Sequence, residues 1–579
     1  MEHHHDADIA AVRKEHREDA VNLVHYLALR QTDLRSLQHL LGQHGLSSLG
    51  RCEPHVLATV RSVRSALDHR PVPPGAAAQG FEEGRVALDR NTDALFGSRP
   101  HGRVVRIMVT LPTEAADDYQ LVRHLVAEGM DVARINGAHD GPAEWERMAL
   151  NVRSASEETG RPCRVSMDLP GPKLRTGPLV AGPKVVRLRP TRDERGLPVA
   201  PARVILRSMA THPADNRPDG PDVVPVDADW IARRRPGDLI TLRDTRDAAR
   251  TFQVADIGPD TCVAEVWDTT YLETGMTLTC DGDRAVVGPL AAVAQFHLLR
   301  IGDELTLTRS LEPVEPWHHG EAGSARIGCT LPELFTVAQP GQRLIFDDGR
   351  IAGQVESVGT DSVLVRVTGA SPNGSKLRCE KSINLPEMVL PIPVITDADL
   401  PLIELAVRHA DMLALSFVRD EHDVDLLLAY LGRFGAGHLG LVMKIETTSA
   451  FARLPEILLR AMRSSAVGVM IARGDLAVEA GFERLAEMQE EILWICEAAH
   501  LPVIWATEVL DQLAHTGRPT RAEVTDAAMA QRAECVMLNK GPHIDSAIEL
   551  LDDILRRMAG HQRKKAAQLR PLCSWVDAL

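Results

Sequence analysis

The chain has 579 residues, of which 44% are hydrophobic and 25% are charged, and its formal net charge is −15. This composition is ordinary for a globular protein and leaves room for two to four domains. The acidic balance and the absence of a long basic run argue against a general nucleic-acid or anionic-membrane binder. No apolar run reaches the roughly 18 residues of a membrane span, and the first ten residues lack the apolar core of a signal peptide.

Nine cysteines are scattered between Cys52 and Cys573, and none forms a C-x-x-C pair. A dispersed, odd-numbered set favours reduced and mostly buried thiols, as in a cytoplasmic protein. We therefore expect a cytoplasmic location and no structural zinc site.

Residues 1–80 are predicted to form a helical N-terminal extension followed by a linker. Leucines recur at helical spacing in 23–29 and 37–41, and 55–70 has the pattern of an amphipathic helix. Residues 71–80, PVPPGAAAQG, have the composition of a linker. Packing on the rest of the chain, or contact between copies in a homo-oligomer, is the simplest role for this region.

Residues 103–177 alternate strand-like and helical patterns. RVVRIMVTL, DVARIN and RVSMDL are predicted strands, and the helical run DDYQLVRHLVAEGM between the first two ends at Gly129, a suitable C-cap. Such alternation predicts a parallel sheet.

Residues 178–382 break this rhythm with short β-like runs and Gly-Pro turns. The stretch that begins at Arg235 resembles the one that begins at Gln339, with Pro236 aligned to Pro340. We interpret the segment as two tandem β-domains, 178–287 and 288–382, inserted into the α/β domain. Chance similarity is the alternative.

Residues 383–560 return to alternating strands and helices, and 561–579 are predicted to be a tail. Five further strand-like runs are DMLALSFV, LGLVMKIE, VGVMIARGD, LPVIWATEVL and AECVMLNKG. With the three earlier strands they make eight, so we predict an α/β fold in which 103–177 and 383–560 form a (β/α)₈ TIM barrel.

Charged residues fall where these strands end, which is the catalytic end of such barrels. Lys444 and Glu446 are two apart on a strand and therefore face the same side. Asp475 ends the next run and follows Gly474, which permits close approach of a ligand. Two carboxylates at neighbouring strand ends can hold Mg²⁺, although an ion pair at the barrel mouth would give the same pattern.

Cations gather at two other strand ends. Arg134 and Asn136 end one run, with His139 after them, and the segment DLPGPKLRTG supplies Asp168, Lys173 and Arg175. The guanidinium group of arginine can donate two parallel hydrogen bonds to phosphate oxygens. These residues favour a phosphoryl-transfer site, with a ring of salt bridges as the structural alternative.

Nine motifs in this order resemble the pyruvate kinase family: GMDVARINGAH, MDLPGPKLRTG, SINLP, ADMLALSFVR, MKIET, VMIARGDLAVE, ATEVLDQL, RPTRAEVTDAA and ECVMLNKG. The resemblance covers about 103–178 and 330–555, and its motifs are specific in combination. It implies transfer of phosphate from phosphoenolpyruvate to ADP, giving pyruvate and ATP, with Mg²⁺ or Mn²⁺ as cofactor. The partners implied are these small molecules, with neither nucleic acid nor membrane.

The resemblance also assigns roles to the strand-end residues. Lys444 would stabilise the enolate and the transferring phosphoryl group, and Glu446 and Asp475 would bind the metal. Gly474 and Asp475 would hold the substrate carboxylate, Thr507 would lie near the methylene carbon that is protonated, and Arg134 would contact the phosphate. Four residues would bind the nucleotide: Asn136, His139, Arg175 and Lys381. The family resemblance also implies that the second β-domain copy is a lid.

The sequence departs from the family where a monovalent cation usually binds. One hydroxyl ligand is missing because Gly137 and Ala138 follow Asn136 there. Leu169 stands in place of a second hydroxyl ligand, and Lys173 stands in place of a glutamate. Family members with lysine at this place typically work without potassium. Our hypothesis is therefore that the Lys173 ammonium has a catalytic role in place of K⁺. A plain salt bridge from Lys173 to Asp168 is the alternative.

Other departures keep different functions open. Glu508, Asn539 and Lys540 stand where the family has other residues, and we expect no C-terminal effector domain. One alternative is a related phosphotransferase that acts on a different enol acid or acceptor. The others are a regulatory pseudoenzyme, which the retained site residues disfavour, and an Mg²⁺-dependent aldolase on a similar barrel, which RPTRAE and GPKLRTG do not suit.

Overall fold

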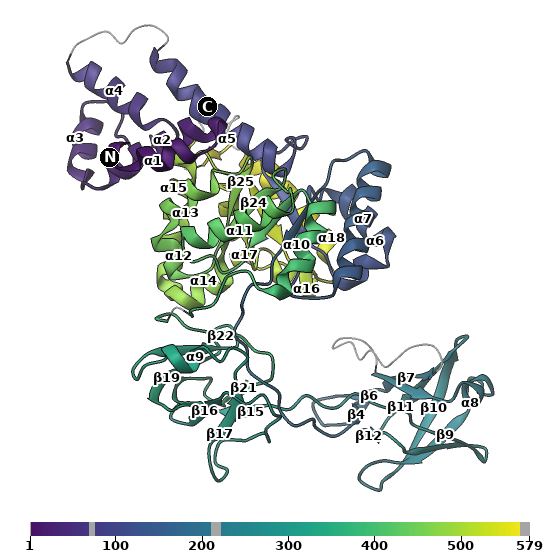
Figure 1. The fold of residues 1–579 in the computed structure, drawn as a ribbon. Coiled ribbons are helices and arrows are strands. Elements are labelled where there is room, and N and C mark those ends of the chain that lie inside the picture. Colours follow the sequence, from purple (N-terminus) through teal and green to yellow (C-terminus); the bar gives the residue numbers. More distant parts are fainter. Residues whose placement is uncertain (1, 69–75, 210–221, 389, 565, 568–579) are drawn as a thin grey trace. The chain divides into compact units, whose positions relative to one another are not determined.

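The computed structural model describes residues 2–68, 76–209, 222–388, 390–564 and 566–567 (Figure 1). Two compact units divide the chain. The first contains Met1–Leu174, Thr336–Val355 and Ser382–Leu579, and the second contains Arg175–Phe335 and Glu356–Lys381.

The first unit is built on a closed barrel of eight parallel strands, as predicted. Neighbours in the barrel follow chain order, and the last strand pairs with the first. The strands are β1 (Arg106–Thr110), β2 (Val132–Asn136), β3 (Arg164–Asp168), β23 (Met412–Leu415), β24 (Gly440–Ile445), β25 (Val467–Ala472), β26 (Val503–Ala506) and β27 (Cys535–Leu538).

Helices surround the barrel, so both faces of the parallel sheet are covered and the strands are apolar nearly throughout. They are α6 (Tyr119–Glu128), α7 (Pro142–Thr159), α10 (Leu400–His409), α11 (Glu421–Arg433), α12 (Thr448–Ala452), α13 (Leu454–Ala461), α14 (Arg473–Ala480), α15 (Phe482–Ala498), α16 (Asp511–Thr516), α17 (Arg521–Ala530) and α18 (Ile544–Met558). The predicted stop at Gly129 is confirmed: its φ is 126°, and α6 ends at the residue before it.

Two strands end earlier than the apolar runs suggested. Residues 473–475 already belong to helix α14, and the run after Ala506 leaves the sheet through residues of positive φ. These are Thr507 (64°), Glu508 (56°) and Leu510 (50°). The backbone turns there because the rim of the barrel is where each strand gives way to its following helix.

The N-terminal region is helical, as predicted, and lies at the end of the barrel opposite α14 and α16 (Figure 1). Its elements are α1 (Glu2–Ala11), η1 (Lys14–His16), α2 (Arg17–Arg30), α3 (Arg35–Gln43), η2 (Glu53–His55), α4 (Val56–Leu67) and α5 (Ala76–Phe96). The predicted linker 71–80 is wrong in its second half, because α5 begins at Ala76; residues 71–75 lie outside the described part.

Helix α5 closes the end of the barrel at which the strands begin. Leu95 and Phe96 are buried among inward-facing side chains of the strands. A Cβ at Gly440 or at Gly468 would lie 2.5 Å from a methyl group of Leu95. Two strand glycines therefore make the space that this leucine fills.

The second unit is mainly β-structure. Its largest sheet has the order β14-β13-β9-β10-β11-β7-β8 around a core that includes Phe252 and Trp230. These strands are β7 (Ala202–Ser208), β8 (Asp222–Val226), β9 (Leu239–Arg243), β10 (Ala249–Ile257), β11 (Thr261–Val266), β13 (Thr277–Cys280) and β14 (Asp283–Val286), with helix α8 (Ala228–Ala232) between β8 and β9.

Shorter elements complete the inserted segment. In the second unit β4 (Val185–Leu188) pairs with β12 (Thr270–Glu273), β5 (Thr191–Arg192) with β6 (Pro198–Ala200), and β15 (His297–Leu299) with β21 (Ser375–Leu377). There β16 (Glu304–Thr308) pairs with β17 (Ala325–Gly328) and β20 (Ser362–Gly369). Helix α9 (Leu334–Val337) precedes β18 (Arg343–Phe346), which pairs with β19 (Ile351–Val358) and β22 (Ile383–Asn384). A last hairpin joins β28 (Gln562–Arg563) and β29 (Ala566–Ala567).

The two β segments that look alike in sequence share a hydrogen-bond pattern. Gly237 donates to the carbonyl of Val254 at 2.8 Å, and Gly341 donates to that of Val355 at the same distance. The tight turn from Gly258 to Thr261 recurs from Gly359 to Ser362, again at 2.8 Å. The same turns at matching positions support a repeated unit, while the domain boundaries remain predictions.

Seven of the eight cysteines in the described residues are buried, and none of the eight forms a disulfide, which agrees with the predicted reduced thiols. Burial raises the pKa of Cys262 and of Cys329 to about 11, so neither is a reactive thiolate. No helix in the described ranges is both long and apolar enough to span a membrane.

Candidate functional site

The ends of strands β2 and β3 bring Arg134 and Asp168 together. Nε of Arg134 donates to Oδ2 of Asp168 at 2.9 Å, and one of its terminal nitrogens donates to the hydroxyl of Thr110 at 3.1 Å. The two strands place them side by side, because Arg134 is in register with Ser166 and Asn136 with Asp168. The guanidinium is therefore held rigidly at the mouth of the barrel.

Asp168 is fully buried and carries a negative charge. Burial alone would raise its pKa, but the charges of Arg134 and Lys444 outweigh burial and hold the pKa of Asp168 below its usual range. Its Oδ1 atom has no hydrogen-bond partner within the described residues. This oxygen is consequently available to a ligand or a water molecule.

Lys444 lies at the centre of the site, at the end of β24. Its Nζ is 3.0 Å from Oε1 of Glu446 and 3.5 Å from Oδ2 of Asp168, and it donates to the hydroxyl of Ser416 at 2.7 Å. Burial favours the neutral amine, yet the carboxylates of Glu446 and Asp168 overcome it and raise the pKa of Lys444. The residue is thus a buried, fixed positive charge.

Glu446 and Asp475 form an acidic pair at the ends of β24 and β25. Burial raises the pKa of Glu446; Lys444 lowers it, and the nearby charge of Asp475 raises it further. The backbone amide of Phe417 donates to the other carboxylate oxygen of Glu446 at 2.6 Å. Two carboxylates that repel each other fit a divalent cation, which relieves the repulsion and prefers oxygen ligands.

The first turn of helix α14 adjoins this pair. Gly474 donates its amide to the hydroxyl of Thr507 at 2.9 Å, which ties the helix start to the left-handed turn after β26. Arg473 holds the same turn, because it donates to the carbonyl of Ala506 at 2.8 Å and to that of Thr507. Free amides at a helix N-terminus favour anions. The predicted residues Gly474, Asp475 and Thr507 are thus brought together.

Lys173 contacts Asp475 and not the predicted alternative, Asp168. Its Nζ is 3.3 Å from Oδ1 of Asp475 and 5.6 Å from the centre of the Phe417 ring. The salt bridge to Asp168 is wrong because Arg134 and Lys444 already surround that carboxylate. The ammonium therefore lies next to the acidic pair.

Packing accounts for part of the departures near Asn136. A Cβ at Gly137 would lie 2.3 Å from a methyl carbon of Leu402 and 2.6 Å from the carbonyl oxygen of Asp168, so a side chain is excluded there. Leu169, where one hydroxyl ligand is missing, is buried in the hydrophobic core. Ala138, where the other hydroxyl ligand is missing, is exposed.

The predicted nucleotide residues are divided between the two units. Asn136 is half-buried, with its side-chain oxygen accepting from the amide of Ala138 at 3.2 Å, and His139 is exposed. Arg175 and Lys381 belong to the second unit. In that unit Arg175 donates to the carbonyl of Glu380 at 3.1 Å, and the amide of Lys381 donates to the hydroxyl of Thr176 at 2.9 Å.

Sequence reasoning missed three residues that shape the site. Ser416 fixes Lys444, the amide of Phe417 fixes Glu446, and Arg473 fixes the turn of Thr507. Ser416 and Phe417 both stand inside the motif ADMLALSFVR, but only Ser416 has a polar side chain that could have marked the site. Arg473 stands inside the ARGD motif, in which only Gly474 and Asp475 were assigned roles from the sequence.

Fold and site together define a (β/α)₈-barrel protein with a cluster of fixed cations and carboxylates at the carboxyl ends of its strands. The family model described as pyruvate kinase, barrel domain, matches residues 102–195 and 273–542. The chain belongs to the pyruvate kinase family. The match leaves out 196–272, which holds strands β7 to β11 of the second unit.

Curated relatives carry the same family name. The chain is 32% identical over 285 residues to a pyruvate kinase of Thermococcus litoralis, covering 48% of this chain and 58% of the relative. It is 26% identical over 450 residues to one of Corynebacterium efficiens, covering 76% and 67%. For Agrobacterium vitis the identity is 35% over 251 residues, covering 42% and 49%. The chain thus spans about half to two thirds of the length of these relatives.

Proposed function

We propose that this protein is a Mg²⁺-dependent pyruvate kinase that transfers phosphate from phosphoenolpyruvate to ADP. The observation that carries the proposal is the cluster of Arg134, Lys444, Glu446 and Asp475 at neighbouring strand ends, beside the first turn of α14. Mn²⁺ is an alternative metal, and a cytoplasmic location accords with the free, buried cysteines.

Substrate binding follows from the fixed charges. The guanidinium of Arg134 and the ammonium of Lys444 attract the phosphate oxygens, because both cations are held before the substrate arrives. The substrate carboxylate binds at the positive N-terminal end of α14, near Gly474 and Asp475. Glu446 and Asp475 hold the metal, which when bound neutralises negative charge on the phosphate oxygens.

The transfer needs charge stabilisation more than covalent participation by the protein. The bond between phosphorus and the enol oxygen breaks as a bond to the terminal ADP oxygen forms, so negative charge develops on the enol oxygen. Lys444 stabilises this charge. A proton then reaches the methylene carbon from the side of Thr507, whose hydroxyl already accepts one hydrogen bond from Gly474.

Lys173 supplies the monovalent charge in this proposal. Its ammonium lies beside Asp475 and over the Phe417 ring, and Gly137, Ala138 and Leu169 offer no hydroxyl ligand for potassium. Turnover is accordingly independent of K⁺. Asn136, His139, Arg175 and Lys381 remain the proposed nucleotide contacts.

A second candidate function keeps the phosphoryl transfer but changes the enol acid or the acceptor. The observation that favours it is the segment 196–272, which lies outside the family match and supplies five strands of the seven-stranded sheet in the second unit. Glu508, exposed and of positive φ in the turn beside Thr507, is a further departure.

Pyruvate formation by the purified protein tests the proposal. Phosphoenolpyruvate, ADP and Mg²⁺ are supplied together, and pyruvate is followed by reduction with a coupled dehydrogenase. We expect turnover that stops when EDTA removes the metal. Binding of phosphoenolpyruvate without pyruvate formation would favour a different acceptor, and absence of phosphoenolpyruvate binding would contradict the pyruvate kinase proposal.

A further inference from the structure

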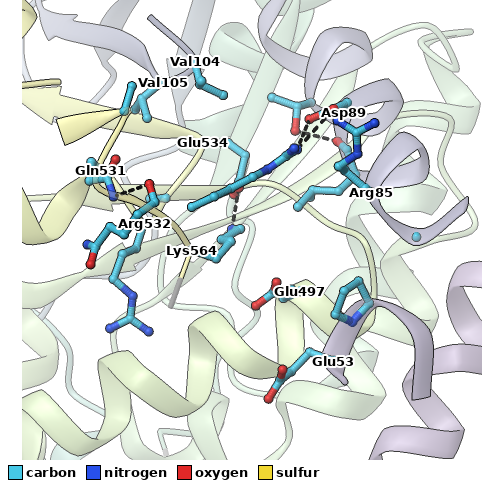
Figure 2. A pocket seen from close by; sticks show the side chains of 18 of the residues that line it. Glu53, Arg85, Asp89, Val104, Val105, Glu497, Gln531, Arg532, Glu534 and Lys564 are labelled. Atoms are coloured by element: carbon cyan, nitrogen blue, oxygen red, sulfur yellow. Dashed lines mark hydrogen bonds and ion pairs between the residues drawn. The ribbon is translucent and has the colours of Figure 1, made fainter. Parts of the chain in front are cut away.

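A cavity of about 450 Å³ lies at the end of the barrel where the strands begin, away from the strand-end site. Its walls come from the start of β1, the segment before β27, helix α5, the residues around η2 and the hairpin strand β28 (Figure 2). The cavity is thus made jointly by the barrel and the N-terminal helices.

The lining is cationic, in contrast to the whole chain. Seven arginine or lysine residues line the cavity with four aspartate or glutamate residues, although the chain carries a net charge of −15. Five of the cations are paired with carboxylates, as Arg563 is with Asp89 and Lys564 with Glu534 (Figure 2). The other two are Arg51 and Arg99.

The guanidinium groups of Arg51 and Arg99 can each bind an anionic partner. Neither forms an ion pair within the described part of the chain, and the one hydrogen bond of the Arg99 side chain runs from Nε to the carbonyl of Arg103 at 3.4 Å. Both side chains are exposed at the cavity wall. An anion in the cavity would meet two guanidinium groups without displacing a carboxylate from either.

Two further arginines of the lining are buried, and each has, within the described ranges, one buried donor without an acceptor. Arg106 is 3% exposed and Arg532 is 8% exposed, and Nε of each has no hydrogen-bond partner among the described residues. An unpaired buried donor is unfavourable, because it has lost its hydrogen bond to water. Both atoms are N–H groups, so what they lack is an acceptor oxygen.

One wall of the cavity is aromatic. The rings of Phe81 and His55 lie 4.2 Å apart, centre to centre, and Phe81 is 38% exposed. Burial lowers the pKa of His55, so this ring is neutral at neutral pH and behaves as an apolar surface. The cavity therefore combines arginines that lack anionic partners in the described part of the chain with an apolar wall of two rings tilted by 55°.

We propose that this cavity binds a small organic phosphate, with its phosphate held by Arg51 and Arg99 and its apolar part against Phe81 and His55. Arginine forks recognise phosphate oxygens well, and 450 Å³ is within the range of small-molecule sites. The inference does not rest on the activity proposed above, because it uses none of the residues at the strand ends.

Calorimetric titration of the full-length chain with phenyl phosphate tests the proposal. We expect saturable one-to-one binding with a Kd below about 1 mM. The double variant Arg51→Gln/Arg99→Gln should bind at least about tenfold more weakly, which corresponds to the loss of about one strong contact. Phe81→Ala should weaken binding of phenyl phosphate but not that of inorganic phosphate.

Two matched variants make the result specific. Arg484→Gln/Arg557→Gln removes two exposed arginines elsewhere in the same unit and should bind as the unmodified protein does. Arg134→Gln alters the strand-end site and should also leave this binding intact. The proposal is overturned if phenyl phosphate does not bind, if the cavity variant binds normally, if both arginine pairs weaken binding equally, or if Arg134→Gln abolishes it.

Discussion

Single residues at the strand ends are fixed by charge and hydrogen bonding before any ligand binds. Lys444 is held by Ser416, Glu446 and Asp168 together, and Arg134 by Asp168 and Thr110. Preorganised charges of this kind avoid the cost of reorganisation during the reaction. The site is thus prepared by residues outside the familiar motifs as well as within them.

Lys173 gives the first residue-scale prediction. Lys173→Glu replaces the fixed cation beside Asp475 with a carboxylate, so turnover in potassium-free buffer should fall at least about tenfold. Lys173→Arg should keep turnover independent of K⁺, since it retains the charge. Steady-state rates with and without added KCl give the measurement. Unchanged, potassium-insensitive activity in Lys173→Glu would show that the ammonium does not serve in place of the ion.

Glu479 gives a prediction about pH. Burial raises the pKa of Glu479 to about 7, and the nearby Asp475 adds to the effect. The folded chain therefore keeps this proton to a higher pH than the unfolded chain, whose value is 4.5. Stability should fall as the pH rises between these values, because the unfolded state then binds fewer protons.

The variant Glu479→Gln removes that penalty. At pH 8 the variant should unfold at a higher urea concentration than the unmodified protein, because its free energy of unfolding should be about 1–3 kcal/mol larger. At pH 4 the free energies of unfolding of the two proteins should agree. Glu487→Gln, an exposed site on α15, serves as control. Equal stability of Glu479→Gln and the unmodified protein at pH 8 would mean that ionisation of Glu479 does not destabilise the fold.

At the scale of elements, helix α5 has a larger role than its place in the N-terminal extension suggested. Leu95 is 1% exposed and fits between Gly440 and Gly468. Leu95→Ala should leave a cavity and destabilise the protein by about 2–4 kcal/mol, as measured by urea unfolding. The exposed Leu67 of α4 provides the comparison. If Leu95→Ala lowers the free energy of unfolding no more than Leu67→Ala does, this packing role is contradicted.

The elements differ in how far the sequence predicts them. The eight strands are apolar on both faces and are followed by helical patterns, so local periodicity was enough for the barrel. The closure by Leu95 depends on two glycines some 345 or more positions away, which no local pattern reveals. The starts of α14 and of the turn at Thr507 were misjudged because each motif continues past the residue at which the sheet ends, which is Ala472 in β25 and Ala506 in β26.

The candidate site shows the same limit. The i, i+2 spacing of Lys444 and Glu446 predicted their common direction, and the structure confirms that they meet at 3.0 Å. The partner of Lys173 was not predictable, because the choice between Asp168 and Asp475 depends on how Arg134 and Lys444 surround Asp168. Long-range charge competition decides such pairings, and spacing in the chain does not encode it.

At the scale of the whole molecule, a pyruvate kinase family barrel carries two additions. One is the helical N-terminal region, which closes the barrel and forms the cationic cavity with it. The other is 196–272, which lies outside the family match and supplies five strands of the seven-stranded sheet in the second unit. The chemistry is assigned to the barrel alone, so it should depend on barrel residues in a way that can be measured directly.

The most direct measurement is ³¹P NMR of phosphoenolpyruvate, ADP and Mg²⁺ with the full-length protein and with Lys444→Met. We predict conversion of the phosphoenolpyruvate signal into that of the γ-phosphate of ATP. The variant should slow conversion at least about a thousandfold while its circular dichroism spectrum stays unchanged. Absence of ATP with the unmodified protein, or equal rates for the two proteins, would contradict phosphoryl transfer at the strand-end site.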